Sequence, residues 1–219
     1  MISSLRYTLV GDGPSDRALL PIIRWMLLEA KTPLPLSASW ADPRRITGTL
    51  TERLRQALDL YPCDLLFVHR DAEKQEPETR REEIKAALTN LSGPPPALCV
   101  VPVRMTEAWL LVEAAAIRRA ADNPNGSVTL PLPLPRELES LPDPKQKLNE
   151  LLRVACDLKG RRLDQFKRDE SARRVRVAEF VQDFAPLGRL PAFQRFQRET
   201  LELMSEQGWL ETNPADNSP

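Results

Sequence analysis

The segment DLLFVH, from Asp64 to His69, is apolar along most of its length, and it restricts the fold more than any other part of the sequence. A strand with apolar side chains on both faces is typical of a parallel sheet that is covered by helices on each side. Further strands are predicted at LRYTLV (Leu5 to Val10), around Leu34 to Trp40 and at ALCVVPV (Ala97 to Val103). Segments with apolar residues at helical spacing separate these runs. The pattern predicts an α/β fold with a doubly wound, mostly parallel sheet of about four strands.

Changes in composition and in hydrophobic periodicity along the 219 residues predict the domain organisation. Residues 1–121 contain all the predicted strands and are expected to form the α/β domain. Residues 122–144 are rich in proline and form a predicted connector. Residues 145–210 have helical spacing and no strand signal, so we expect a helical C-terminal subdomain packed on the sheet. The polar residues 211–219 are expected to form a flexible tail.

The composition excludes several classes of protein. The chain has 31 basic and 31 acidic residues, so no global charge attracts it to nucleic acid or to a membrane. Its three cysteines contain no CxxC pair, which argues against a structural zinc site. The N-terminus lacks the layout of a signal peptide, and no apolar run is long enough to span a membrane. We therefore expect a cytoplasmic protein without membrane contact, and the sequence indicates no oligomeric state.

Carboxylates follow three of the predicted strands. They are Asp12 and Asp16 in VGDGPSD, Asp71 and Glu73 in HRDAE, and Glu107 in RMTEAW. The carboxyl ends of parallel strands form the ligand crevice of an open α/β sheet. Carboxylates that meet there repel one another unless they share a cation or a proton. Because hard divalent cations prefer oxygen ligands, the pattern predicts a Mg²⁺ or Mn²⁺ site at this edge.

The individual residues allow more than one role. Asp12 directly follows the first strand and is the better ligand, whereas Asp16 is better placed to cap the following helix. Glu107 either takes part in catalysis, as a ligand or general base, or only stabilises a helix N-terminus. His69 is the only histidine, and it either has a structural role or transfers protons beside Asp71.

Basic residues near these motifs are candidate phosphate contacts. Arg104 precedes Glu107, and it either binds phosphate or pairs with one of the acids. The segment 153–176 carries nine lysines and arginines against four acids, among them Arg161 and Arg162. Such a cluster can bind a phosphodiester backbone without reading bases, although a solvated helical face is the common alternative.

The order of these motifs resembles the Toprim fold, which topoisomerases, primases and overcoming-lysogenization-defect nucleases share. A more detailed similarity connects the chain with a Toprim-related family of unknown function that often lies near bacterial defence genes. The residues that carry it are VGDGPSDRALLPII, DLLFVHRDAE, VPVRMTEAWLL, LPDPKQKLNELL and RVAEFVQDFAPLGRLPAFQRF, which together extend from Leu5 to about Leu203.

The resemblance implies roles for matching residues. Asp12 corresponds to the first-strand acid of the family, and Asp71 and Glu73 correspond to its metal-binding D-x-D pair. Glu107 matches the helix-start acid, with a catalytic role beside Asp71, and Lys145 falls in a matching segment where it could neutralise phosphate. Two positions depart from the Toprim pattern, which has Glu in place of Asp12 and Asp in place of Glu73.

The implied activity is divalent-metal-dependent cleavage of nucleic acid, in anti-phage defence, with a protein partner encoded in the same defence operon. Two alternatives remain at this point. The chain could be a non-catalytic interaction subunit of a defence or repair complex, with a degenerate Toprim site. It could also be a phosphotransferase or phosphohydrolase that acts on small molecules.

Overall fold

The computed structural model describes residues 2–72 and 75–211, and four parallel strands form its centre. β1 (Leu5–Val10) lies between β2 (Leu36–Trp40) and β3 (Leu65–His69), and β4 (Ala97–Val100) pairs with the outer side of β3. The sheet order is therefore β2-β1-β3-β4. This arrangement confirms the predicted doubly wound α/β fold, and it is consistent with a Toprim-like topology.

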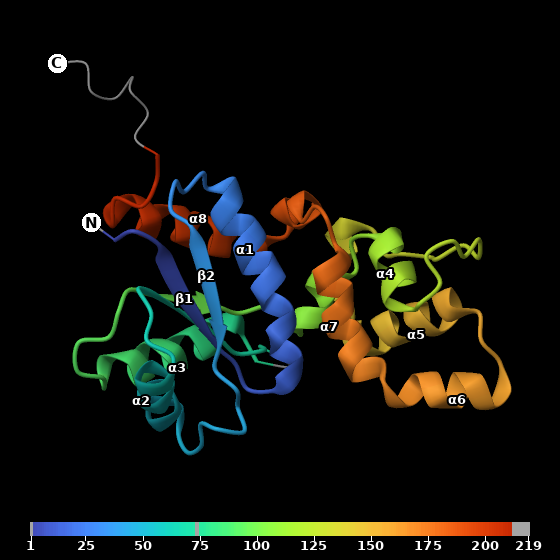
Figure 1. The fold of residues 1–219 in the computed structure, drawn as a ribbon, viewed down its shortest axis with the longest axis horizontal. Helices are drawn as coiled ribbons and strands as arrows, with labels where there is room; N and C mark the ends of the chain where they lie inside the picture. Colours follow the sequence, from blue (N-terminus) through green and yellow to red (C-terminus); the bar gives the residue numbers. More distant parts are fainter. Residues whose placement is uncertain (1, 73–74, 212–219) are drawn as a thin grey trace.

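Helices cover both faces of the sheet (Figure 1). In β3, Leu65 and Phe67 belong to the core under α1 and α8, whereas Leu66 and Val68 belong to the core under α2 and α3. Successive side chains of a strand point to opposite faces, so a strand covered on both sides must be apolar at nearly every position. The covering helices are α1 (Leu19–Glu29), α2 (Leu50–Leu60), α3 (Pro77–Thr89) and α8 (Pro191–Glu206).

The start of α2 shows how local sequence sets a helix boundary. The Thr49 hydroxyl oxygen accepts the backbone N–H of Glu52 at 3.4 Å, and a Glu52 carboxylate oxygen accepts the backbone N–H of Thr49 at 2.7 Å. This reciprocal capping box satisfies two N–H groups that the first helical turn leaves free.

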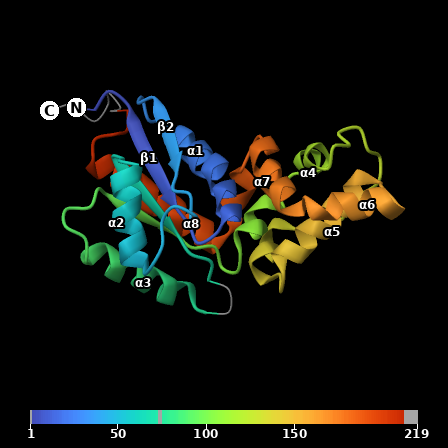
Figure 2. The same ribbon diagram turned by 60° about the horizontal axis from the view of Figure 1, so that its bottom comes forward.

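Four further helices form a lobe beyond the carboxyl ends of the strands (Figures 1 and 2). We call this part the helical lobe. Its α4 packs on α5 and α7, although it precedes the predicted connector in the sequence. The helix predicted to begin near Glu107 is in fact a 3-10 turn followed by the separate α4. The lobe comprises α4 (Ala114–Ala120), α5 (Pro144–Cys156), α6 (Gly160–Arg168) and α7 (Glu170–Phe180). The 3-10 turns are η1 (Pro14–Ala18), η2 (Thr106–Leu110), η3 (Pro135–Ser140) and η4 (Ala185–Arg189).

Aromatic side chains tie the last helix to the sheet and to η2. Phe196 of α8 stacks on Trp109 with ring centroids 6.0 Å apart, and it meets Phe67 of β3 edge-on at 6.0 Å. Phe193 contacts Trp109 at 5.2 Å. One continuous apolar core therefore extends from the α1 and α8 side of the sheet into the helical lobe. Within residues 2–72 and 75–211, no helix is long and apolar enough to cross a membrane.

Replacing Phe196 with Ala should lower the free energy of unfolding by roughly 3–5 kcal/mol, because it leaves a cavity where three aromatic rings meet. Urea denaturation followed by tryptophan fluorescence measures this change. Leu201 lies on the same helix with 38% of its surface exposed, so Leu201→Ala should change stability by no more than about 0.5 kcal/mol. Equal effects of the two substitutions would contradict the packing described for α8.

Candidate functional site

The candidate site lies where the carboxyl ends of β1 and β3 face the helical lobe (Figure 2). The loop after β1 continues into η1, the loop after β3 contains Asp71, and η2 follows β4. From the lobe, α7 packs against both η1 and η2, and α5 packs against η2. Because parallel strands end at one edge, segments far apart in the sequence deliver their polar side chains to the same region.

His69, at the end of β3, is the buried centre of this region. Only 1% of its surface is exposed. Its Nδ1 lies 2.9 Å from the carbonyl oxygen of Val100, which can only accept, so Nδ1 carries a proton. Its Nε2 lies 3.4 Å from Asp71 Oδ1 and 3.8 Å from Asp16 Oδ2. The Nε2 side of the imidazole therefore faces two carboxylates, which follow two different strands.

These neighbours decide the charge of His69. Burial lowers its pKa, but the hydrogen bond with Asp71 and the negative charges of Asp16 and Asp71 raise it by more, to about 9. The ring is consequently an imidazolium at neutral pH. It supplies, from within the chain, a positive charge that lets the two carboxylates lie near each other.

Asp16 and Asp71 also hold the adjacent loops. Asp16 Oδ2 accepts the backbone N–H groups of Asp12 and Gly13, at 2.7 and 2.9 Å. Asp71 Oδ1 accepts the backbone N–H of Thr106 at 3.0 Å, which fixes the start of η2. Asp16 thus fastens the turn after β1, in agreement with the capping role predicted for it, although it does so from the third residue of η1.

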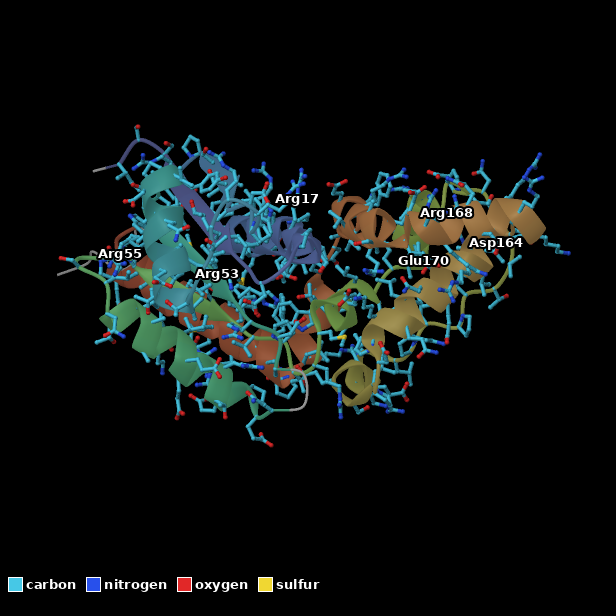
Figure 3. All side chains as sticks on the ribbon, turned by 90° about the horizontal axis from the view of Figure 1, so that it is seen from below. Arg17, Arg53, Arg55, Asp164, Arg168 and Glu170 are labelled. Carbon is cyan, nitrogen blue, oxygen red and sulfur yellow. The ribbon has the colours of Figure 1, made fainter. Side chains whose placement is uncertain are left out.

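Asp12 is enclosed by two arginines. Its carboxylate oxygens lie 2.9 Å from Arg53 Nη1 and 3.0 Å from Arg70 Nε. Arg53 also donates to the carbonyl oxygen of Gly11, and Arg70 donates to Glu83 at 2.9 Å. With 41% of its side-chain surface exposed, Asp12 remains open to solvent. Figure 3 shows Arg53 on the sheet side of the molecule, away from the helical lobe.

Glu107 is buried at the interface with the helical lobe. Arg174 of α7 places its Nε 3.1 Å from Glu107 Oε1, and both side chains are less than 10% exposed. Burial raises the pKa of Glu107; its own backbone N–H and the charge of Arg174 oppose this shift, and Asp71 adds to it. The positive charge of Lys145 lowers the pKa of Glu107 and is the weakest of these influences.

The other predicted phosphate contacts lie in different surroundings. Arg104 is half-buried, and its Nε has no hydrogen-bond partner among the residues that the structure describes. Arg161 and Arg162 are exposed on α6, the outer helix of the lobe. Figure 3 shows Arg168 of this helix well apart from Arg53. The structure therefore places Arg161 and Arg162 on a surface apart from Asp71 and Glu107, and it leaves Lys145 exposed at the start of α5.

Oxygen ligands of the predicted type are present, but they form no complete metal cluster. Asp12 and Asp71 offer carboxylate oxygens that suit Mg²⁺ or Mn²⁺, and Mg²⁺ often takes only one or two carboxylates and keeps several waters. Within residues 2–72 and 75–211, no three His, Cys, Asp or Glu side chains are grouped so that they could hold one ion. Glu73, the third predicted ligand, lies outside the described residues.

The sequence did not predict that Arg53, Arg70 and Arg174 are the partners of these acids, and Arg174 was counted only within the basic segment 153–176. Arg70 stands between His69 and Asp71 in the sequence, so its position alone was a usable signal. Arg53 and Arg174 belong to helices that are distant from the acids in sequence, and only the packing of α2 and α7 shows that they reach them.

No family model matches the chain, and no curated protein or solved structure matches it either. Function is therefore inferred from the geometry and charge of the site.

Because His69 is the only histidine, its NMR signal identifies it directly. We expect its pKa in the metal-free protein to be about 9, well above the ordinary value of 6.5. Since the folded value is the higher one, the stability contributed by the imidazolium is complete below about pH 6.5 and is lost as the pH rises through about 9. Asp16→Asn should lower this pKa, and Asp59→Asn, on the exposed side of α2, should leave it unchanged. Titration of His69 below pH 7 would contradict its placement between two carboxylates.

Proposed function

We propose that this protein cleaves phosphodiester bonds of nucleic acid with the help of Mg²⁺ or Mn²⁺. The observation that carries the proposal is that an exposed carboxylate, a partly exposed one and two arginines lie at the carboxyl edge of a parallel sheet. Asp12 and Asp71 offer oxygen ligands there, and Arg53 and Arg70 offer guanidinium groups suited to a phosphate.

Each residue then has a distinct task. Asp71 and Asp12 would hold the metal ion, with waters in the remaining positions. When bound, the ion supplies Lewis-acid activation of the phosphodiester and of the attacking water. Arg53 and Arg70 would exchange the carboxylate of Asp12 for the negative charge of the phosphate. Glu107 would accept a proton, because a buried carboxyl with a raised pKa is a stronger base than an ordinary one.

Two groups would position the nucleic acid backbone. Lys145 is exposed at the start of α5, and α5 packs against η2, which carries Glu107. Other basic side chains of the helical lobe already form ion pairs, since Arg153 pairs with Glu170 and Arg173 pairs with Asp122. Arg161 and Arg162 form no ion pair with the described carboxylates, which leaves them available to phosphates.

One observation favours a second candidate, a non-catalytic subunit of a defence or repair complex. Three acids of the candidate site already have positive partners. Asp12 has two arginines, Asp71 has His69, and Glu107 has Arg174. A site neutralised in this way can be stable without metal. Such a protein would act by binding a partner, for example one encoded beside it in a defence operon.

Asp71→Asn should reduce cleavage by at least about a hundredfold, because it removes a ligand charge while keeping the side-chain shape. The assay uses end-labelled single-stranded and double-stranded DNA and RNA with Mg²⁺, Mn²⁺ or EDTA. Asp59→Asn is the matched control, since Asp59 is an exposed acid on α2 outside the site.

The second candidate makes the opposite prediction for the same samples. It is favoured if the wild type cleaves none of these substrates and calorimetry detects no Mn²⁺ binding. Release of phosphate from nucleotides in the absence of nucleic acid would instead indicate a small-molecule phosphohydrolase.

Replacing Arg161 and Arg162 together with Ala should weaken nucleic acid binding similarly for all sequences. It should also reduce the slope of log affinity against log salt by about 2, roughly one unit for each lost phosphate contact. Fluorescence anisotropy with labelled oligonucleotides measures both quantities in EDTA, which prevents cleavage. Arg136 and Arg198 are exposed on other elements, so their double Ala variant is the control. An equal loss of affinity in both double variants would show that α6 makes no preferential contact with nucleic acid.

A further inference from the structure

A cavity of about 340 Å³ lies between α1, the edge strand β2 and α7, and it contains none of the residues assigned to the candidate site. Its volume falls within the range of small-molecule sites. Apolar side chains form part of its wall, and polar side chains from four elements, β1, η1, α1 and α7, line it as well. The residues that matter for binding are Tyr7, Arg17, Leu20, Arg24, Ala38 and Glu179.

Tyr7 provides a buried polar group without a partner. Its side chain is 1% exposed, and its hydroxyl makes no hydrogen bond with any described residue. Buried hydroxyl groups are nearly always hydrogen-bonded, so one without a partner needs an explanation. Burial raises the pKa of Tyr7 to about 12, while the positive charge of Arg24 lowers it. The hydroxyl is therefore a hydrogen-bond donor at neutral pH, and Tyr7 and Arg24 line the same cavity.

The arginines of the cavity are also without partners. Arg17 lies in η1 and Arg24 lies in α1, and both side chains are exposed. In the described part of the chain, neither pairs with a carboxylate, unlike Arg53 and Arg70 at the candidate site. Figure 3 shows Arg17 at the end of α1 that lies next to α7. Glu179 is the only acid among the lining residues, so the cavity carries excess positive charge.

We propose that this cavity binds a small organic anion with an aromatic or other apolar body. The anionic group would accept hydrogen bonds from the exposed Arg24 and, after a small shift of the side chains that cover it, from the Tyr7 hydroxyl, and Arg17 would add a second positive charge. The apolar body would lie against Leu20 and Ala38. Because α1 and α7 both line the cavity, the ligand would connect the sheet layer with the helical lobe. This inference does not depend on the proposed nuclease activity.

Calorimetry on the full chain tests the proposal with 2-naphthoate as the probe. The neutral 2-naphthalenemethanol tests the need for the charge, and acetate tests the need for the apolar body. We expect a single saturable binding event for 2-naphthoate, binding at least about tenfold weaker for the alcohol, and no detectable binding of acetate. Absence of saturable 2-naphthoate binding at millimolar concentrations overturns the proposal, and so does equal binding of the charged and neutral probes.

Variants locate the binding event. Tyr7→Phe and Arg24→Ala should each weaken 2-naphthoate binding by about tenfold. Glu179→Gln should strengthen binding, because it removes a negative charge from the cavity. Arg136→Ala is the matched control, an exposed arginine of η3 that does not line the cavity, and it should bind like the wild type. Tyr7→Phe should have a thermal midpoint at least as high as the wild type, since it loses only an unpartnered hydroxyl. Unchanged binding in both Tyr7→Phe and Arg24→Ala overturns the proposal.

Discussion

The charge of the buried His69 is balanced from two strand ends, and the geometry of the site depends on this balance. Asp16 reaches the imidazolium from η1, and Asp71 reaches it from the loop after β3. The same two carboxylates hold the backbone of the β1 loop and the start of η2. Without the positive ring, two acids near each other in a poorly solvated region would repel. Through its two carboxylate partners, His69 thus connects the loop after β1, the loop after β3 and the start of η2.

The remaining charges of the site follow the same rule with partners from other layers. Asp12 is neutralised by α2 and by the end of β3, and Glu107 is neutralised by α7 of the helical lobe. Under the proposed function, a metal ion or a phosphate that entered this edge would take the place of one of these partners. The arginines released from Asp12 would then be free for the phosphate, which would couple the two proposed binding events.

The sheet was predictable from the apolar runs, because β3 is buried on both faces and is therefore apolar at nearly every position. They also placed Asp71 and Asp12 at one edge. The partners of these acids could not be predicted, since Arg53 and Arg174 reach the site through the packing of helices distant in sequence. The high pKa of His69 depends on two carboxylates that together outweigh the effect of burial, and no single segment contains that information. The helix expected from Glu107 is divided into η2 and α4, and Trp109 of η2 stacks on Phe196 of α8.

The contact between Trp109 and Phe196 limits how this chain can be dissected experimentally. It joins a segment that precedes the connector to the last helix, and Phe196 also covers Phe67 of the sheet. A C-terminal deletion intended to remove the basic surface of α6 would also strip the sheet of one of its covering layers. Loss of activity in such a deletion would report a collapsed core and reveal nothing about substrate contacts. Mapping the functional surfaces of this protein therefore requires point substitutions in the intact chain.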